Sequence, residues 1–246
     1  KSFHMKVIIF SILCAILFPL KVQAQMFSVD GDETERRANP FAPYLRAGVK
    51  VIDFSYQEDP SVLEESANRD LSFNGTAATL GFEAGGFEIG VSLGNELTGL
   101  DETKYFDLNL AFSNPFYFIR NEGFAAGVPL ELGSTLRNVR NSNAGNDFSQ
   151  TKLNIGAGAA VLFYNPEKFM ISTQFLPHVG FSTASGGMIG GNVFSLSGKA
   201  RVSFFNLLFG RNISFGYDYQ YDSYNIDGNE LDYDFSGHTI TLGVSL

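Results

Sequence analysis

Long runs in which apolar and polar residues alternate one for one are the feature that most constrains this chain. The segment "NISFGYDYQYDSY" (residues 212–224) places apolar or aromatic residues from Ile213 to Tyr221 at every second position, with small or polar residues between them. Successive side chains of a strand point to opposite faces. The pattern therefore predicts a strand with one oily face and one polar face, whereas a helix would spread the same residues around its whole surface.

About ten segments of this kind follow one another, and no helical period interrupts them. Each has roughly the length that a tilted membrane strand needs, and turn residues separate them, which is the sequence signature of a transmembrane β-barrel. The expected strands lie near residues 43–56, 71–84, 87–97, 103–113, 124–137, 151–164, 169–184, 193–206, 212–223 and 235–246.

The connections between these segments alternate in character. One set consists of "AGG", "NPFYFIRNEG", "NPEK" and "LLFGR". The other set is on average longer, more polar and more acidic: "QEDPSVLEESANRD", "TGLDE", "VRNSNAGNDFSQ", "SGGMIGGN" and "NIDGNELDYD". Outer-membrane barrels have short periplasmic turns and longer outer loops. The sequence thus predicts an all-β, transmembrane, antiparallel up-and-down barrel of about ten strands, with eight or twelve as alternatives and both termini in the periplasm.

The last segment, "GHTITLGVSL", is expected to close the barrel by pairing with the first strand near "YLRAGVKVIDF". Ile240, Leu242, Val244 and Leu246 then face lipid. Over nearly all of the mature chain this pattern resembles the small bacterial outer-membrane β-barrels of the broad OmpA/OmpW-like group. The resemblance implies that the barrel assembly machinery recognises the terminal strand, although Leu246 stands where many such proteins carry phenylalanine.

Two prolines interrupt the pattern. Pro129 and Pro177 fall inside expected strands, where proline cannot donate a ladder hydrogen bond and a closed barrel offers no edge strand. We therefore expect a β-bulge or a strand limit at each of them.

The N-terminal part has a different composition. Residues 5–24, "MKVIIFSILCAILFPLKVQA", have the charge, apolar run and small-residue cleavage site of a secretory signal peptide. Residues 25–42 are expected to form a flexible periplasmic leader, and residues 43–246 the barrel. Cys14, the sole cysteine, lies in the signal, so the mature chain has no disulfide and no cysteine metal ligand. A lipoprotein alternative would lipidate Cys14, but a long apolar stretch follows it.

The net charge limits the choice of partners. The chain has 17 Lys and Arg and 26 Asp and Glu; three lysines and no acid precede the cleavage point, which leaves 14 against 26, a net charge of −12. Such a chain is a poor partner for nucleic acid, because phosphate binding needs a basic face. The expected location is the bacterial outer membrane. The expected partners are outer-membrane lipid, the barrel assembly machinery and a surface ligand at the acidic outer loops.

Charged residues at inward positions form the candidate site. Charges inside a narrow barrel are costly unless they are paired. One interpretation is a lumen closed by paired charges, and the other is a narrow polar pore or small-solute site. The candidate residues, with six basic and six acidic side chains and one histidine, are Arg46, Lys50, Glu83, Glu88, Asp107, Glu131, Arg137, Lys152, His178, Lys199, Arg201, Asp218 and Asp222.

Aromatic and polar-tipped residues at outward positions predict an interface girdle, in which Tyr217, Tyr219 and Tyr221 lie beside His238. The sequence offers no catalytic, cofactor or metal-site residues. The loop "NIDGNELDYD" is rich in oxygen ligands, but it lacks the full spacing of a calcium-binding EF-hand, and a solvated acidic loop is the favoured interpretation.

The predicted function is a structural, surface-interaction or small-pore role without enzymatic activity. One alternative is a barrel enzyme that acts on outer-membrane lipid or surface peptides, and it requires His178 or His238 to join acids or a serine in an open cleft. A second alternative is a soluble secreted β-sandwich, which would bury one apolar face of each strand against another sheet.

Overall fold

The computed structural model describes residues 42–58, 72–100, 102–142, 148–184, 189–226 and 231–246. The expected signal peptide, nearly all of the expected leader and parts of the longer loops lie outside this range. Strands account for most of the described residues from Tyr44 onward. They are β1 (Tyr44–Glu58), β2 (Phe73–Ala84), β3 (Phe87–Gly94), β4 (Thr103–Asn121), β5 (Phe124–Asn141), β6 (Phe148–Ala157), β7 (Ala159–Asn165), β8 (Phe169–Ala184), β9 (Ile189–Leu208), β10 (Arg211–Ile226) and β11 (Leu231–Ser245), with a single 3₁₀ turn, η1 (Glu96–Thr98).

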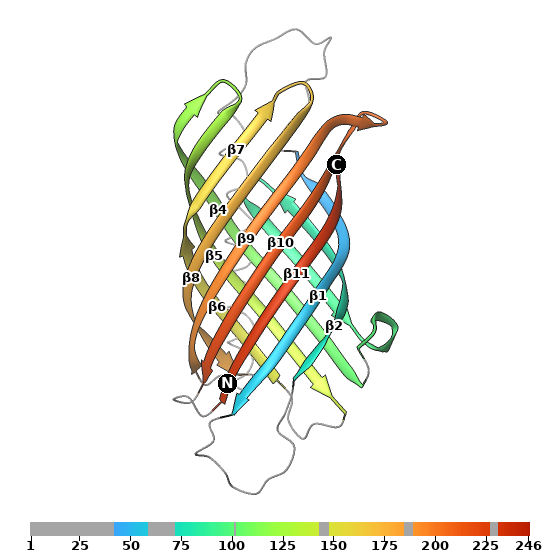
Figure 1. Ribbon diagram of the computed structural model, residues 1–246, viewed down its shortest axis with the longest axis vertical. Coiled ribbons are helices and arrows are strands. Elements are labelled where there is room, and N and C mark those ends of the chain that lie inside the picture. The colour runs from blue at the N-terminus through green and yellow to red at the C-terminus, as the bar shows by residue number, and fades with distance from the viewer. Residues whose placement is uncertain (1–41, 59–71, 101, 143–147, 185–188, 227–230) are drawn as a thin grey trace, which may run out of the picture. The chain divides into compact units, whose positions relative to one another are not determined.

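The strands form one closed antiparallel sheet (Figure 1). β1 pairs with β2 on one side and with β11 on the other, from Tyr44↔Ser245 to Glu58↔Leu231. β6 and β7 both lie between β5 and β8, so they share one place in the ring. The eleven described strands thus occupy ten positions around the barrel. The prediction of an all-β antiparallel barrel closed by the C-terminal segment is confirmed.

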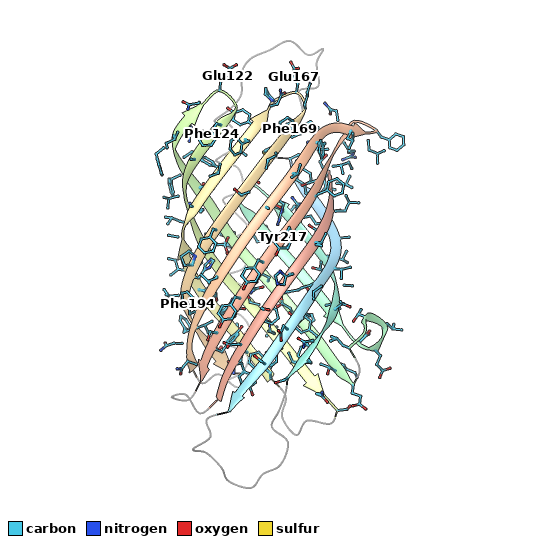
Figure 2. All side chains as sticks on the ribbon, in the orientation of Figure 1. Glu122, Phe124, Glu167, Phe169, Phe194 and Tyr217 are labelled. Carbon is cyan, nitrogen blue, oxygen red and sulfur yellow. The ribbon has the colours of Figure 1, made fainter. Side chains whose placement is uncertain are left out.

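The two ends of the barrel differ in their connections. Short turns gather at one end, called here the turn end, where Glu122 and Glu167 lie (Figure 2). At the β2–β3 turn, Gly85 and Gly86 both have positive φ, of 56° and 87°. Such a two-residue turn fits the right-handed twist of a hairpin, and glycine adopts it without steric cost. The opposite end, called the loop end, is where the other strand ends lie, among them Asn141 of β5 and Phe148 of β6.

One expected connection is wrong. The segment "NPFYFIRNEG" was expected to be a turn, but β4 continues to Asn121 and pairs with β5 as far as Asn121↔Phe124. The register of this pairing shifts by one residue at a β-bulge between Tyr117 and Ile119. The N-terminal part of β5 supplies hydrogen-bond partners for this part of β4. The sequence of residues 114–123 by itself does not show that these partners exist. β9 likewise runs to Leu208, into the expected "LLFGR" connection.

The expectation of bulges or strand limits at the two prolines is also wrong. β5 and β8 run through Pro129 and Pro177 without a shift in register. The interruption lies instead between them, at Gly158, where the strand expected at residues 151–164 divides into β6 and β7. The register places Gly158 opposite Pro129, whose carbonyl accepts a hydrogen bond from the Gly158 amide at 3.3 Å. Because proline lacks an N–H, the neighbouring strand loses a ladder partner here.

The barrel has an apolar exterior and a polar interior. Exposed apolar side chains, such as Leu45, Leu80, Ile155, Val179 and Ile240, cover the outward faces. The charged candidates alternate with them along the strands and face inward, mostly buried. This distribution is the reverse of a soluble sandwich, which would hide its apolar faces.

Candidate functional site: the barrel interior

All thirteen charged or histidine candidates take part in ion pairs inside the barrel. Together they are called the ionic layer. They come from nine of the eleven described strands, all except β7 and β11. Their inward direction follows from the period of two, because each has the same parity as its polar neighbours on the strand.

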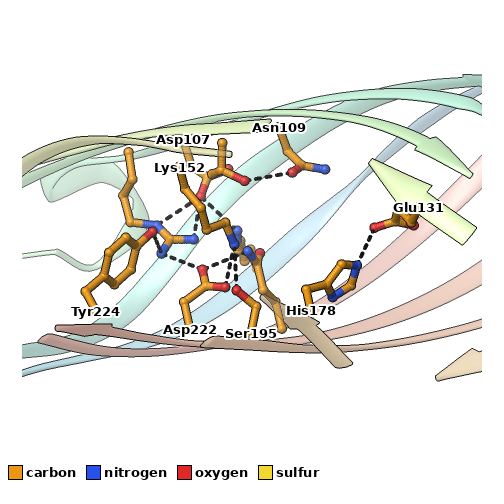
Figure 3. Close-up of polar contacts among 12 residues, drawn as sticks. Asp107, Asn109, Glu131, Lys152, His178, Ser195, Asp222 and Tyr224 are labelled. Carbon is orange, nitrogen blue, oxygen red and sulfur yellow. Dashed lines mark hydrogen bonds and ion pairs between the residues drawn. The ribbon is translucent and has the colours of Figure 1, made fainter. Parts of the chain in front are cut away.

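The first group of the ionic layer centres on Arg137, whose side chain is fully buried. Its guanidinium Nη2 lies 3.0 Å from Asp107 Oδ2, and its Nη1 lies 2.9 Å from Asp222 Oδ2. Lys50 Nζ lies 3.3 Å from the same oxygen of Asp107, and Lys152 Nζ lies 2.5 Å from Asp222 Oδ1. The five groups thus form a continuous chain in which cations and carboxylates alternate (Figure 3).

Neutral side chains complete this first group. The hydroxyl of Tyr105 donates to Asp107 at 2.8 Å, and the amide of Gln220 donates to Asp222 at 2.9 Å. Arg137 also donates to the hydroxyl of Tyr224 at 3.2 Å. Both carboxylates therefore accept several hydrogen bonds, which offsets much of the cost of burying their charge.

The second group lies beside the first and centres on Lys199. Its ammonium lies 2.9 Å from Glu88 and 3.1 Å from Glu131. Glu131 in turn lies 3.2 Å from His178 Nε2. The ring of His178 lies directly over Gly156, because a Cβ at that glycine would come within 2.2 Å of the ring. Glycine at this position makes the room that the imidazole occupies.

A third group joins the remaining candidates. Arg201 lies 2.7 Å from Asp218 and 3.6 Å from Glu83. Arg46 lies 2.8 Å from the same oxygen of Glu83, and it also donates to the hydroxyl of Ser214 at 3.2 Å. Glu83 is about one third exposed and is the least buried member of the ionic layer.

Several of these pairs cross the lumen instead of joining neighbouring strands. Lys199 lies on β9 and Glu88 lies on β3, five places apart in a ring of ten, which places them on opposite walls. Arg137 on β5 and Asp222 on β10 are four places apart. Ion pairs in these directions hold opposite walls together, and they place charged side chains in the middle of any path through the barrel.

Seven aromatic side chains form a second layer nearer the loop end, called the aromatic layer: Phe54, Phe73, Tyr105, Phe148, Tyr224, Tyr233 and Phe235. The rings of Phe54 and Phe148 are 5.0 Å apart in an edge-on contact, although β1 and β6 lie on opposite sides of the ring. Phe148 also contacts Tyr224 and Tyr233, at 5.4 and 4.8 Å. Six of the seven are below one tenth exposed; Phe73 is partly buried.

Sequence reasoning missed the aromatic layer, because it singled out aromatic residues only at outward positions, namely Tyr217, Tyr219 and Tyr221. A signal was present: Tyr224 shares the inward parity of Asp218 and Asp222, and Phe235 shares that of Thr239 and Thr241. The alternation continues unchanged along these strands. On the inward face of these strands, the change from polar to aromatic residues thus marked the boundary between the ionic layer and the aromatic layer.

Phe235 connects the two layers. The guanidinium carbon of Arg137 lies 3.4 Å from the centre of its ring, and Lys50 Nζ lies 5.1 Å from it. Cations favour the electron-rich face of an aromatic ring. The ring thus packs against aromatic neighbours and against two members of the ionic layer.

A cavity of about 120 Å³ lies within the ionic layer. His178 Nδ1, Ser197 Oγ and Thr241 Oγ1 belong to residues that line it, and these buried atoms have no hydrogen-bond partner among the described residues. Buried polar groups of this kind are usually satisfied by internal water. The cavity is large enough for several water molecules and too small for a sugar or a peptide.

The expected girdle residues lie on the outward faces of β10 and β11. The hydroxyl of Tyr217 lies 2.8 Å from His238 Nδ1, and the ring of Tyr219 lies 5.0 Å from the imidazole. Tyr221 donates to Asp234 at 3.1 Å. The structure thus gathers these four predicted residues in one exterior row, which begins with Tyr217 opposite Ile240 and extends toward the loop end (Figure 2).

Within the described residues there is no group of three His, Asp or Glu side chains placed to hold a metal ion, and the central part of the acidic loop "NIDGNELDYD" lies outside them. No described helix is long and apolar enough to cross a bilayer.

Comparison with known proteins finds a likeness in structure alone. No family model matches the chain, and no curated protein sequence resembles it. The outer-membrane protease OmpT from Escherichia coli is 9% identical, with 86% of this chain and 98% of that chain covered and a TM-score of 0.38. Neisserial surface protein A is 12% identical, with 83% of this chain and 97% of that chain covered and a TM-score of 0.36. The outer-membrane enzyme PagL is 11% identical, with 81% of this chain and 99% of that chain covered and a TM-score of 0.35.

The chain thus resembles small bacterial outer-membrane β-barrels, as its alternating segments indicated. At these identities and TM-scores the likeness concerns the general fold, and it carries no argument about activity, site or partner.

Proposed function

We propose that this protein is a bacterial outer-membrane β-barrel with a closed lumen, which acts through its surface as a structural or interaction component. The observation that carries the proposal is that contacts between opposite walls cross the interior at two levels. Lys199 reaches Glu88 in the ionic layer, and Phe54 meets Phe148 in the aromatic layer. A ring of ten strands leaves little interior space once side chains fill it.

The exterior supports the membrane location. Along β11, outward side chains are apolar from Ile240 to Leu246, and the row of His238 and Tyr219 lies at the loop-end limit of this band. The nine residues from His238 to Leu246, at about 3.3 Å each and tilted by about 40°, span roughly 20 Å of membrane. This height fits the apolar band of outer-membrane barrels, and a closed sheet leaves no unpaired edge in lipid.

The two described histidines favour a role without catalysis. His178 is 2% exposed and faces Glu131 inside the barrel, where a lipid or a peptide has no access. His238 is exposed, but its Nδ1 lies beside the hydroxyl of Tyr217, and among the described residues it forms no hydrogen bond or ion pair with a carboxylate or a serine. A hydrolytic site needs a nucleophile or an activated water beside its base.

The test is conductance in a planar bilayer. The mature chain is refolded in detergent, shown to be a folded barrel by its heat-dependent mobility on gels, and inserted into the membrane. A silent membrane that contains folded protein is the expected result. Regular conductance steps from the folded wild-type protein would contradict the closed lumen and favour a small pore, with Lys199 and Glu88 as the first residues to examine.

A further inference from the structure

Three consecutive apolar side chains are largely exposed where β9 passes into β10 at the turn end. Leu207, Leu208 and Phe209 are 61%, 50% and 96% exposed, and together they are called the apolar tip. They belong to the segment "LLFGR", which the sequence predicted to be a plain connection. A run of three exposed apolar residues is unfavourable in water, and such a run usually marks a contact surface.

The backbone of this tip has a conformation that suits glycine. Phe209 and Gly210 have φ of 50° and 74°. The β2–β3 turn has the same arrangement at Gly85 and Gly86, with φ of 56° and 87°. Such turns prefer glycine, asparagine or aspartate, because a bulky side chain at positive φ clashes with its own backbone. Phe209 thus raises the energy of its turn while its ring packs against almost nothing in the described chain, and a contact outside the chain would offset this cost.

A β-bulge determines where the apolar tip points. Next to the tip the register of the β9–β10 ladder shifts, and three residues of β9 face Asn212 alone. The side chain of Asn212 accepts a hydrogen bond from the amide of Asn206 at 3.1 Å, and the amide of Asn212 donates to Ser245 Oγ at 2.9 Å. Bulges bend the strand that carries them. The end of this hairpin accordingly turns away from the barrel wall (Figure 1, orange), and these hydrogen bonds hold the bend.

We propose that the apolar tip inserts into the lipid leaflet at the turn end and anchors the barrel there. The inference rests on the proposed membrane location, because the exterior meets lipid only in a bilayer. The outward surface below the tip is already apolar: Phe204 and Phe215, on the same hairpin, are 39% and 53% exposed. The tip therefore continues the surface that meets lipid. Leucine and phenylalanine are also the residues that interfacial anchors place at the acyl boundary.

A lipid fits this tip better than a second protein does. Three side chains at a hairpin end offer far less area than a stable protein interface, which buries roughly 800 Å² on each partner. The bend also directs the tip away from the barrel wall, toward the surrounding leaflet (Figure 1). Arg211, the charged residue that follows the tip, donates to the carbonyl of Ser245 at 3.1 Å. A long basic side chain of this kind keeps its charge at the head groups while its stem lies in apolar surroundings.

The chain contains no tryptophan, so a single introduced tryptophan reports on the tip. The Phe209→Trp variant keeps an aromatic ring at the turn. It is refolded into phosphatidylcholine vesicles whose acyl chains carry bromine near the head group, where the bromine quenches tryptophan on contact. We expect a loss of roughly half of the fluorescence, because interfacial anchors reach about 5–10 Å into this boundary. Glu167→Trp, in the polar turn between β7 and β8, is the matched control and should lose little.

Quenching of Phe209→Trp no greater than that of Glu167→Trp would overturn the inference, since the tip would then lie in water and a protein would be the remaining occupant. Leu242→Trp, on the exterior of β11, separates this result from failure of the proposed function. Bromine quenches it wherever the barrel spans the membrane, whereas a protein that does not insert is quenched at neither position. The gel test for folded barrels is applied to each variant.

Discussion

The ionic layer and the aromatic layer fill the same lumen by different physical means. The ionic layer neutralises six cations with six carboxylates, yet it leaves a cavity of about 120 Å³ and several unpartnered polar atoms. The aromatic layer has rings 4.8 to 6.4 Å apart, and the hydroxyls of Tyr105 and Tyr224 are hydrogen-bonded to members of the ionic layer. Ion pairs are directional, so the ionic layer determines which strands are joined across the barrel. Aromatic rings contribute mainly by filling volume. For the proposed closed lumen, the comparison predicts that closure is redundant, with each layer able to block the lumen alone.

The largest expected effect comes from weakening both layers together. Phe148→Ala removes the ring that meets Phe54, and Lys199→Ala with Glu88→Ala removes the pair between opposite walls. We expect each change by itself to leave the bilayer silent, and the combined variant to conduct. Conductance of the folded variants in planar bilayers measures this. If Phe148→Ala alone conducts, the aromatic layer is the sole barrier and closure is not redundant.

Within the ionic layer, Arg137→Met should be the most destabilising single substitution. It leaves the buried Asp107 and Asp222 each short of a partner, and removal of one member of a buried ion pair costs about 3–5 kcal/mol. The free energy of unfolding from urea titration in lipid vesicles tests this. Lys168→Gln, in an exposed turn, is the matched control. A change as small as that of the control would show that Lys50 and Lys152 suffice for the two carboxylates.

Within the aromatic layer, Phe148→Ala should lower the free energy of unfolding by about 3 kcal/mol, because it opens a cavity among Phe54, Tyr224 and Tyr233. Phe148→Leu keeps much of the volume and should cost less than half as much. The same urea titration measures both. Equal losses from Ala and Leu would indicate that ring geometry matters more than filled volume.

The smallest effect expected is at a glycine. Gly156→Ala should lower the free energy of unfolding by about 1–3 kcal/mol, because the new methyl group would lie 2.2 Å from the ring of His178 and push it away from Glu131. Gly90→Ala is the matched control, since its methyl group would lie 4.0 Å from the nearest atom, the carbonyl oxygen of Leu80. Similar unfolding curves for the two variants would show that the imidazole has room to move.

The period of two predicted most of the fold and the composition of the ionic layer. It placed Asp218 and Asp222 on the inside of β10 and Tyr217 on the outside, because the direction of a side chain depends only on its own strand. The same rule placed Lys199 and Glu88 inside, although nothing in the sequence joins them. It could not show that β4 continues to Asn121, since that segment is stabilised by pairing with β5.

The sequence by itself determined that this chain forms strands, which face of each strand is polar, and that the charges inside balance. These properties are local, since they need only the alternation along each strand and a count of residues. The tertiary structure decided which charges meet, that Phe54 and Phe148 come together across the barrel, and that the strand breaks at Gly158. Each of these depends on the order and register of strands around the ring, which bring together residues far apart in the chain.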